Sequence, residues 1–302
     1  MTHRLPFAAA AVAAAVLALA GCETFDQVVE VGTGVAVATG NLSSSQAASI
    51  NKAGKAVSKT FDDITPEQEY YIGRTVAATC LARYKALDDA RLNAYLNLLG
   101  QTLSRFSTRP ETFGGYHFLL LQSEDLNAFA APGGLILVTR GLVDCCTTED
   151  ELAAVLAHEI GHVQNRDGLR AIRTGRLNTA LTTLATEGAK TLAGPELAEV
   201  TSAFDDSINE ITGTLINSGY SRRQEFQADA AAVTILRAAG YSPAALRIML
   251  QNMEKRWDPK RHDFAATHPS PPDRIAQLAK LVPETAVPVN AERARRFRAA
   301  VK

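Results

Sequence analysis

The sequence has few of the features that set a chain apart from ordinary globular proteins. It has one tryptophan and four cysteines in 302 residues, and neither sign of charge dominates, since 31 basic residues stand against 32 acidic ones. Because basic residues are not in excess, the composition argues against a nucleic-acid partner and against a protein held at a membrane by electrostatic attraction. With 46% hydrophobic and 21% charged residues, the composition predicts a folded chain with one main domain and appendages.

Long apolar runs are also missing, apart from one at the N-terminus. Residues 7–20 form an unbroken apolar stretch that follows His3 and Arg4 and leads into a Leu-Ala-Gly-Cys sequence ending at Cys22. The stretch is shorter than the roughly 20 residues of a membrane span, and its order of segments is typical of a signal peptide. A plain secretory signal or a transmembrane anchor is the alternative. We predict a lipoprotein signal peptide over residues 1–21 and a bilayer anchor through acylated Cys22.

The residues after Cys22 suggest a cellular location and a domain organisation. Glu23 stands where enteric lipoproteins retained at the inner membrane carry Asp, so we expect the periplasmic face of the outer membrane. Residues 22–64 hold the lipidated cysteine and a Gly- and Ser-containing spacer. We predict a catalytic domain over 65–282, tethered by lipid alone, and a basic, solvated C-terminal tail over 283–302.

The scarcity of cysteine leaves the disulfide question open. If Cys22 is acylated, an odd number of thiols remains, at Cys80, Cys145 and Cys146. A bond from Cys80 to one of the adjacent pair is compatible with an oxidising compartment. Three buried thiols are equally compatible.

Hydrophobic spacing predicts a mainly helical α+β fold. Thr65, Pro66 and Gln68 form a helix start with a capping box, and a second helix is expected over 89–104. Three strand candidates follow at 116–121, 126–130 and 135–139. We predict a small sheet beside the next helix, with Leu135, Ile136, Leu137, Val138 and Thr139 as its edge strand, along which an extended peptide could add.

The sequence His158-Glu159-Ile160-Gly161-His162 lies in the helix that begins at Thr147 or Thr148. Residues four apart share a helix face, so His158 and His162 can offer two imidazole nitrogens to one ion. Glu159 lies about 100° around the helix, where it can reach a metal-bound water without ligating the metal. This pattern predicts a zinc site of a hydrolase, with one Zn²⁺ per chain and Glu159 as general base.

A catalytic zinc site normally needs a third protein ligand. A metzincin continuation is absent, because Asn165 and Gly168 occupy the positions of its glycine and third histidine. Glu225 on a later helix is the candidate, with Asp229 one turn beyond to accept the outer N–H of a zinc histidine. The other interpretation is an exposed helix face on which these carboxylates pair with Arg222 and Arg223.

The two motifs together resemble the gluzincin metallopeptidases of the HtpX and CAAX prenyl protease family, peptidase M48. His-Glu-x-x-His is followed by Ser-Arg-x-x-Glu-x-x-Ala-Asp at 221–229, and segments 127–134, 139–142 and 267–274 also match. The resemblance covers about 65–281 and implies a zincin-like domain with ligands His158, His162 and Glu225 and with Asp229 and Arg222 around them. It also places His268 near the metal, either in the open zinc position at rest or polarising the scissile carbonyl. The Leu-Ala-Gly-Cys sequence at 19–22, a lipoprotein signal motif (lipobox), is similar to that of the family's periplasmic LoiP and BepA branch.

The resemblance implies a zinc metalloendopeptidase that cleaves unfolded or misassembled envelope proteins, with outer-membrane assembly machinery as a possible partner. A chaperone-like assembly factor with secondary proteolysis is the alternative from another class, and an exopeptidase is a third. Residues 169–219 lie between the two motifs and are interrupted by polar and charged residues. We expect two amphipathic helices there, beside or over the cleft.

Overall fold

A computed structural model describes residues 64–171, 219–256, 268, 271–283, 287 and 290–301, with scattered residues between 30 and 51. Two compact units divide the chain, and the larger comprises residues 65–177 and 199–302. The signal peptide, Cys22, almost all of the spacer and most of residues 169–219 lie outside the described residues, so the expectations for them stay predictions. The domain boundaries also stay predictions.

The larger unit begins with two helices whose starts the sequence encodes. Helix α4 (Pro66–Arg83) has the expected capping box, in which Thr65 and Gln68 bond reciprocally. Helix α5 (Ala90–Ser104) begins after Asp89, whose carboxylate accepts from Leu92 N–H at 2.9 Å. Side-chain acceptors thus satisfy backbone donors that have no partner in the first turn of a helix.

Three strands form one mixed sheet in the order β1-β3-β2. Strands β1 (His117–Leu121) and β3 (Leu135–Thr139) are parallel, whereas β2 (Ala128–Ala131) is antiparallel to β3. The short 3₁₀ helix η1 (Pro132–Gly134) joins β2 to β3. The prediction that 135–139 is the edge strand is therefore wrong. Strand β3 is apolar because it is the central strand, paired on both sides.

The outer side of β1 is covered by side chains of α5. Asn97 accepts from Phe118 N–H at 3.0 Å and donates to its C=O at 2.6 Å, and Asn93 accepts from Leu120 N–H at 2.9 Å. These amides take the place of a neighbouring strand. Among the described strands, β2 is therefore the edge strand without a strand on its outer side, and its four residues are buried.

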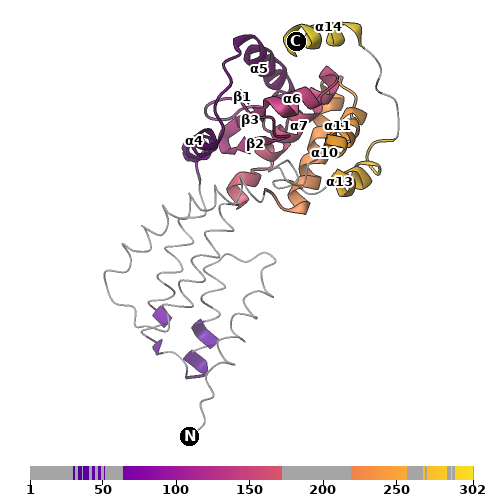
Figure 1. Ribbon diagram of the computed structural model, residues 1–302. Coiled ribbons are helices and arrows are strands. Elements are labelled where there is room, and N and C mark those ends of the chain that lie inside the picture. Colours follow the sequence, from indigo (N-terminus) through magenta and orange to yellow (C-terminus); the bar gives the residue numbers. More distant parts are fainter. Residues whose placement is uncertain are drawn as a thin grey trace. The chain divides into compact units, whose positions relative to one another are not determined.

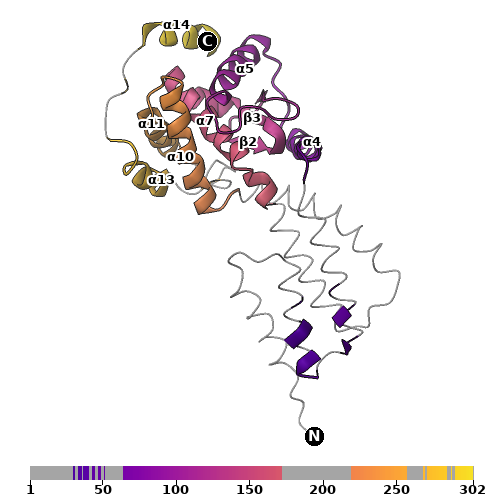
Figure 2. The ribbon, with the colours of Figure 1, turned by 180° about the vertical axis from the view of Figure 1, so that it is seen from behind.

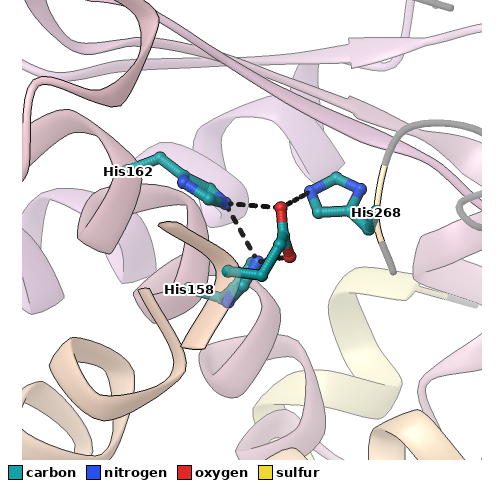
Figure 3. Close-up of side chains that lie close together, drawn as sticks. His158, His162 and His268 are labelled. Atoms are coloured by element: carbon teal, nitrogen blue, oxygen red, sulfur yellow. Dashed lines mark hydrogen bonds and ion pairs between the residues drawn. The ribbon is translucent and has the colours of Figure 1, made fainter. Parts of the chain in front are cut away.

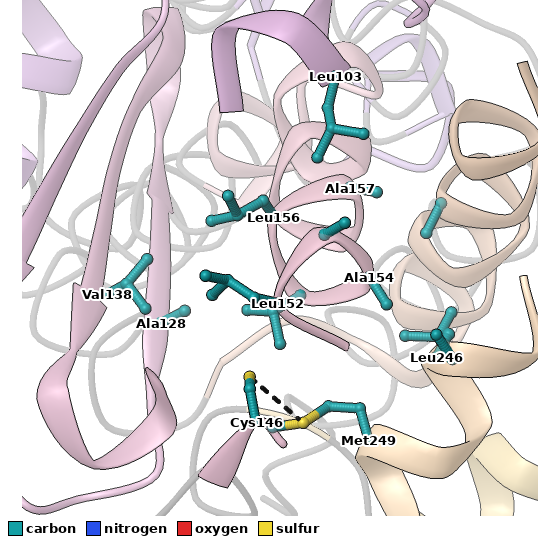
Figure 4. Close-up of a cluster of buried hydrophobic side chains, with 14 of the residues drawn as sticks. Leu103, Ala128, Val138, Cys146, Leu152, Ala154, Leu156, Ala157, Leu246 and Met249 are labelled. Carbon is teal, nitrogen blue, oxygen red and sulfur yellow. Dashed lines mark hydrogen bonds between the residues drawn. The ribbon is translucent and has the colours of Figure 1, made fainter. Parts of the chain in front are cut away.

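Helix α7 (Glu149–Gln164) follows the short helix α6 (Arg140–Cys145) and occupies the centre of the unit. Figures 1 and 2 show the sheet and α4 on one side of α7 and helices α10 (Arg222–Ala238), α11 (Ala244–Arg256) and α13 (Pro271–Leu278) on the other. Leu152 and Leu156 are fully buried, facing Val138 of the sheet, while Leu246 of α11 packs from the opposite side (Figure 4). A helix buried on all sides can hold side chains at fixed positions.

The C-terminal helix α14 (Ala291–Val301) corrects the expectation of a solvated tail. It packs against α5 and α7, and its Phe297 belongs to the main hydrophobic core. Arg296 forms an ion pair with the buried carboxylate of Glu149, and Arg293 bonds to Asp150 at 3.0 Å. Two of its basic residues thus pair with acidic side chains in the first turn of α7.

Two further expectations concern membrane spans and thiols. Within the described ranges, none of the helices combines the length and apolar character that crossing a bilayer requires. Cys80, Cys145 and Cys146 are all free and buried. The structure thus has three buried thiols and no disulfide among them. Burial raises the pKa of the Cys80 thiol to about 12.

Candidate metal centre

Helix α7 presents the two histidines at the heart of the site. Thr148 caps its N-terminus, and the following turns bring His158 and His162 onto one buried face. Their Nε2 atoms lie 3.2 Å apart, and their rings meet edge to face at 4.7 Å between centroids. Two imidazole nitrogens at this separation can bind one ion.

Helix α10 supplies a carboxylate to the same point. Ser221 and Gln224 form a capping box that starts the helix and leaves Glu225 in its first turn. Glu225 is fully buried, so the interpretation of an exposed helix face is wrong. Its Oε2 lies 3.4 Å from His158 Nε2, and its Oε1 lies 3.4 Å from His162 Nε2.

The close approach of α10 to α7 depends on a glycine inside the first motif. A Cβ at Gly161 would lie 2.9 Å from Ala228 C=O, closer than real Cβ contacts. Glycine at this position therefore allows the two helix backbones to come near enough for Glu225 to reach the histidines.

His268 completes the group with Glu225. Figure 3 shows its imidazole turned toward the same point as the imidazoles of His158 and His162. His268 Nε2 lies 3.6 Å from Glu225 Oε1, and one donor atom from each of the four residues falls within 4.8 Å of the others. Burial holds the pKa of His268 well below its ordinary value, so its ring is neutral.

The donor set fits zinc. Zinc favours imidazole nitrogen and carboxylate oxygen in tetrahedral sites, with bonds of about 2.0–2.1 Å that place neighbouring donors roughly 3.3 Å apart. The separations of 3.2 to 3.4 Å among His158, His162 and Glu225 match that spacing. Burial lowers the pKa of His162, but Glu225 and Asp167 outweigh burial and raise it to about 10. The same negative surroundings favour a metal cation.

Glu159 lies beside this group and is also fully buried. Neither of its carboxylate oxygens has a hydrogen-bond partner within the described part of the chain. Burial raises the pKa of Glu159, a shift that the two motif histidines only partly oppose. A buried carboxylate without a protein donor is placed to accept from a water or a substrate.

A buried ion pair between Asp229 and Arg274 contacts His158 on the Nδ1 side of its ring. Asp229 Oδ1 lies 3.0 Å from His158 Nδ1, as the sequence predicts for the outer nitrogen of a zinc histidine. Arg274 of α13 donates two hydrogen bonds, of 2.6 and 2.9 Å, to the same carboxylate. Burial raises the pKa of Asp229, but Arg274 and His158 outweigh burial and lower it to about 2. The pair fixes the orientation of His158.

The sequence prediction assigned the wrong arginine to the site. Arg222 is exposed, and its Nη2 lies 3.5 Å from Asp273 on the surface. Arg274 takes the place predicted for it, with Nη1 3.6 Å from Glu225 Oε2. Arg222 stands at the first turn of α10, outside the face that packs on α7.

Two contacts of His162 were not predicted. Asp167 Oδ2 lies 2.9 Å from His162 Nδ1, and Asp167 is fully buried beyond the end of α7. Tyr220, just before α10, stacks on the His162 ring at 4.2 Å and donates its hydroxyl to Ala130 C=O at 2.9 Å. A carboxylate five residues after a zinc histidine is the one sequence signal that could have indicated Asp167.

Comparison with known proteins agrees with this geometry. The family model of peptidase family M48 matches residues 90–282, which is more than half of the chain. The chain belongs to peptidase family M48. The predicted family and zincin-like fold class are thereby confirmed, and the membership supports a zinc metalloprotease.

Several relatives of this M48 chain carry protease names. The metalloprotease LoiP of Escherichia coli K12 is 31% identical over 188 residues, covering 62% of this chain and 68% of LoiP. The beta-barrel assembly-enhancing protease of the same strain is 28% identical over 197 residues, covering 63% and 39%. The mitochondrial metalloendopeptidase OMA1 of Schizosaccharomyces pombe is 30% identical over 167 residues, covering 53% and 45%. The chain thus spans about two fifths of the barrel-assembly relatives.

Proposed function

We propose that this chain is a zinc metalloendopeptidase that hydrolyses peptide bonds in unfolded or misassembled cell-envelope proteins. The observation that carries the proposal is the convergence of His158, His162 and Glu225 at ligand spacing, beside a buried Glu159 without a protein partner. Family membership supports the reaction class, and the names of LoiP and the barrel-assembly protease support the envelope setting.

In this proposal His158, His162 and Glu225 hold one Zn²⁺. Held there, a zinc ion would supply a water with its pKa lowered toward about 7 and a positive charge to polarise the substrate carbonyl. The Glu159 carboxylate takes the proton of the attacking water and passes it to the departing amine nitrogen. Asp229 and Asp167 hold the Nδ1 protons of the two histidines, which leaves both Nε2 atoms as donors toward the metal.

His268 has two possible roles within the same proposal. Its Nε2 is close enough to the other donors to fill the fourth zinc position at rest. It is equally close enough to donate to a carbonyl oxygen once that position is open. A His268→Ala variant separates these roles, because loss of a resting ligand raises activity whereas loss of a carbonyl donor lowers kcat.

The substrate would add as a strand to β2, the edge strand of the described sheet, once its buried outer side is uncovered. Main-chain pairing accepts almost any side-chain sequence, as an enzyme acting on unfolded chains requires. Acylated Cys22 would hold the enzyme at the periplasmic face of the outer membrane. Barrel-assembly machinery is the partner that the relatives' name suggests.

Comparing wild type with Glu159→Gln tests the reaction. We expect the zinc-loaded wild-type chain to cleave unfolded casein internally, the Gln variant to lose at least about 100-fold in kcat, and both to bind one zinc. Glu124→Gln, at another acidic position of the described unit, serves as the matched control. A wild type without zinc, or a Gln variant as active as wild type, would contradict the proposal. Release of terminal residues alone would indicate an exopeptidase.

The name of the barrel-assembly relatives favours one second candidate, a chaperone-like assembly factor with secondary proteolysis. This alternative predicts that Glu159→Gln still restores barrel-protein assembly in cells lacking the gene. The endopeptidase proposal predicts that the Gln variant fails to do so although it is expressed at wild-type level.

A further inference from the structure

Helix α7 is followed by a turn that favours glycine but contains an arginine. Arg166 has a φ of 56°, and among the described residues it is the one non-glycine residue with a positive φ. A Cβ disfavours this left-handed conformation, so contacts around the residue must hold it. The chain returns to helical conformation at the next residue, Asp167.

The turn at Arg166 brings the Asp167 carboxylate back to the metal helix. Asp167 Oδ2 lies 2.9 Å from His162 Nδ1, and both side chains are fully buried. Gln224 Nε2 and Arg170 Nη1 approach the other oxygen, Oδ1, at 3.4 and 3.6 Å. These longer contacts act on the far oxygen of the carboxylate. The backbone at Arg166 therefore decides whether Oδ2 reaches His162.

Glu69 of α4 holds the Arg166 side chain. The Glu69 carboxylate is buried, and its Oε2 accepts from Arg166 Nη2 at 2.9 Å. Arg109 donates to both oxygens of this carboxylate, at 2.6 and 2.7 Å, which fixes its orientation. Helix α4 itself lies in direct contact with η1, because a Cβ at Gly73 would collide with Pro132 C=O. Glu69 is therefore a fixed acceptor for Arg166.

We propose that Glu69 positions the metal ligand His162 from a distance. The Glu69 carboxylate holds the Arg166 side chain and so maintains the left-handed turn. The turn in turn places Asp167 against His162 Nδ1. Glu69 is thus a positioning residue, which acts through Arg166 and Asp167 and touches neither the metal nor the substrate. This inference rests on the proposed function, since it assumes that His162 ligates zinc.

Two substitutions at Arg166 separate the backbone from the side chain. Arg166→Ala removes the bond to Glu69 but keeps a Cβ, whereas Arg166→Gly removes the bond and the strain together. We expect Arg166→Ala to weaken zinc binding about 3- to 10-fold. Arg166→Gly should stay within about two-fold of wild type, because glycine adopts the turn without support. Competition with a fluorescent zinc chelator on the full-length chains measures both affinities.

Glu69→Gln tests whether the effect passes through Arg166. We expect zinc affinity to fall about 3- to 10-fold in the wild-type background and to stay unchanged in the Arg166→Gly background. A residue that only docks α4 would weaken zinc binding equally in both backgrounds. Glu67→Gln, at an exposed glutamate of the same helix, is the matched control and should leave the affinity unchanged. Circular dichroism at the assay temperature verifies that every variant is folded.

A readout in the zinc-free chain reports the contact itself. The Nδ1 proton of His162, bonded to a carboxylate, gives a downfield proton NMR resonance that its loss in Asp167→Asn assigns. We expect Arg166→Ala and Glu69→Gln to weaken this resonance and Arg166→Gly to retain it. Equal zinc affinities in the two Arg166 variants, wild-type affinity in Glu69→Gln, or an unchanged resonance in Glu69→Gln overturns the inference.

These outcomes are distinguishable from those of the proposed function. If wild type binds zinc but does not hydrolyse casein, the peptidase proposal falls, and the affinity comparison still decides the role of Glu69. If wild type binds no zinc, the proposed zinc site falls. The NMR resonance then still decides whether Glu69 controls the contact between Asp167 and His162.

Discussion

Each motif histidine is held on its Nδ1 side by a buried aspartate, Asp229 for His158 and Asp167 for His162. An acceptor at Nδ1 fixes the tautomer that leaves Nε2 free to ligate, and it makes the imidazole a stronger ligand. The orientation of both histidine rings is therefore set by these contacts. Sequence spacing predicted one of these aspartates, because Asp229 lies one turn from Glu225 on the same helix.

Asp167→Asn should weaken zinc binding about 10- to 100-fold, the usual effect of losing a carboxylate behind a zinc histidine. Competition with a fluorescent zinc chelator measures the affinity. Asp144→Asn is the control, since Asp144 is an exposed aspartate whose carboxylate pairs with Arg140 on the surface. Equal affinities in Asp167→Asn and wild type would show that Asp167 has no part in positioning His162.

The Arg274 guanidinium is almost fully buried against Asp229, and its removal would leave a carboxylate in the protein interior without its cation. We expect Arg274→Leu to lower the free energy of unfolding by about 3–5 kcal/mol. Arg222→Leu, at the exposed arginine first expected near the site, should change it by less than about 0.5 kcal/mol. Urea unfolding of both variants measures the difference, and similar losses would contradict the assignment of Arg274 to the buried pair.

At the scale of elements, helix α4 is joined to the end of the metal helix by one carboxylate. Glu69 accepts two bonds from Arg109 and one from Arg166, which follows α7, and Gly133 N–H of η1 also donates to it. Burial raises the pKa of Glu69, but Arg109 and Arg166 outweigh burial and lower it below its ordinary value of 4.5. Three other chain segments thus bond to one buried anion of α4.

The stability from Glu69 should depend on pH with a defined sign. Because its folded pKa is lowered, the contribution is fully present above about 4.5, the value of the unfolded chain, and is lost as pH falls through the folded value. We expect Glu69→Gln to cost about 1–3 kcal/mol at pH 7, and the gap to wild type to shrink below pH 4.5. Urea unfolding over a pH series measures it, and a gap that widens with acid would refute this account.

Helix α14 stabilises the opposite end of α7. The buried carboxylate of Glu149 accepts from Arg296 and from the hydroxyls of Tyr95 and Tyr241. Arg296 is half exposed, so water replaces part of its contribution. We expect Arg296→Met to lower the unfolding free energy by about 1 kcal/mol and exposed Arg298→Met to leave it unchanged. Thermal unfolding of the two variants measures the difference, and equal melting temperatures would mean that the Arg296–Glu149 pair contributes no stability.

The elements also show why some predictions succeeded. Caps are local, so the starts of α4 and α7 could be read from Thr65 and Thr148. Strand order depends on contacts between distant segments. The apolar sequence of β3 is therefore compatible with either an edge strand or a central strand. The α5 amides that close β1 lie about 20 residues before it, and no pattern within the strand indicates them.

For the whole molecule, the motif residues come from chain segments that are distant in sequence yet meet inside one buried core. His158 and His162 could be paired from their spacing, and Glu225 from the second motif. The partners Asp167, Arg274 and Tyr220 could not be assigned, because their roles depend on how the regions around α7, α10 and α13 pack. Helical packing around α7 therefore defines the environment of the site, while the two motifs define its donors.

The central claim is that two histidines and one glutamate bind zinc in this core. X-ray absorption at the zinc edge of the stoichiometrically loaded full-length chain tests it most directly. The account predicts a four-coordinate zinc with at least two imidazole nitrogens at about 2.0–2.1 Å, the remaining ligands oxygen or a third imidazole, and no sulfur. Substituting Glu225→Ala should remove one oxygen neighbour and weaken binding. A thiolate ligand, or a zinc environment unchanged by Glu225→Ala, would contradict the claim.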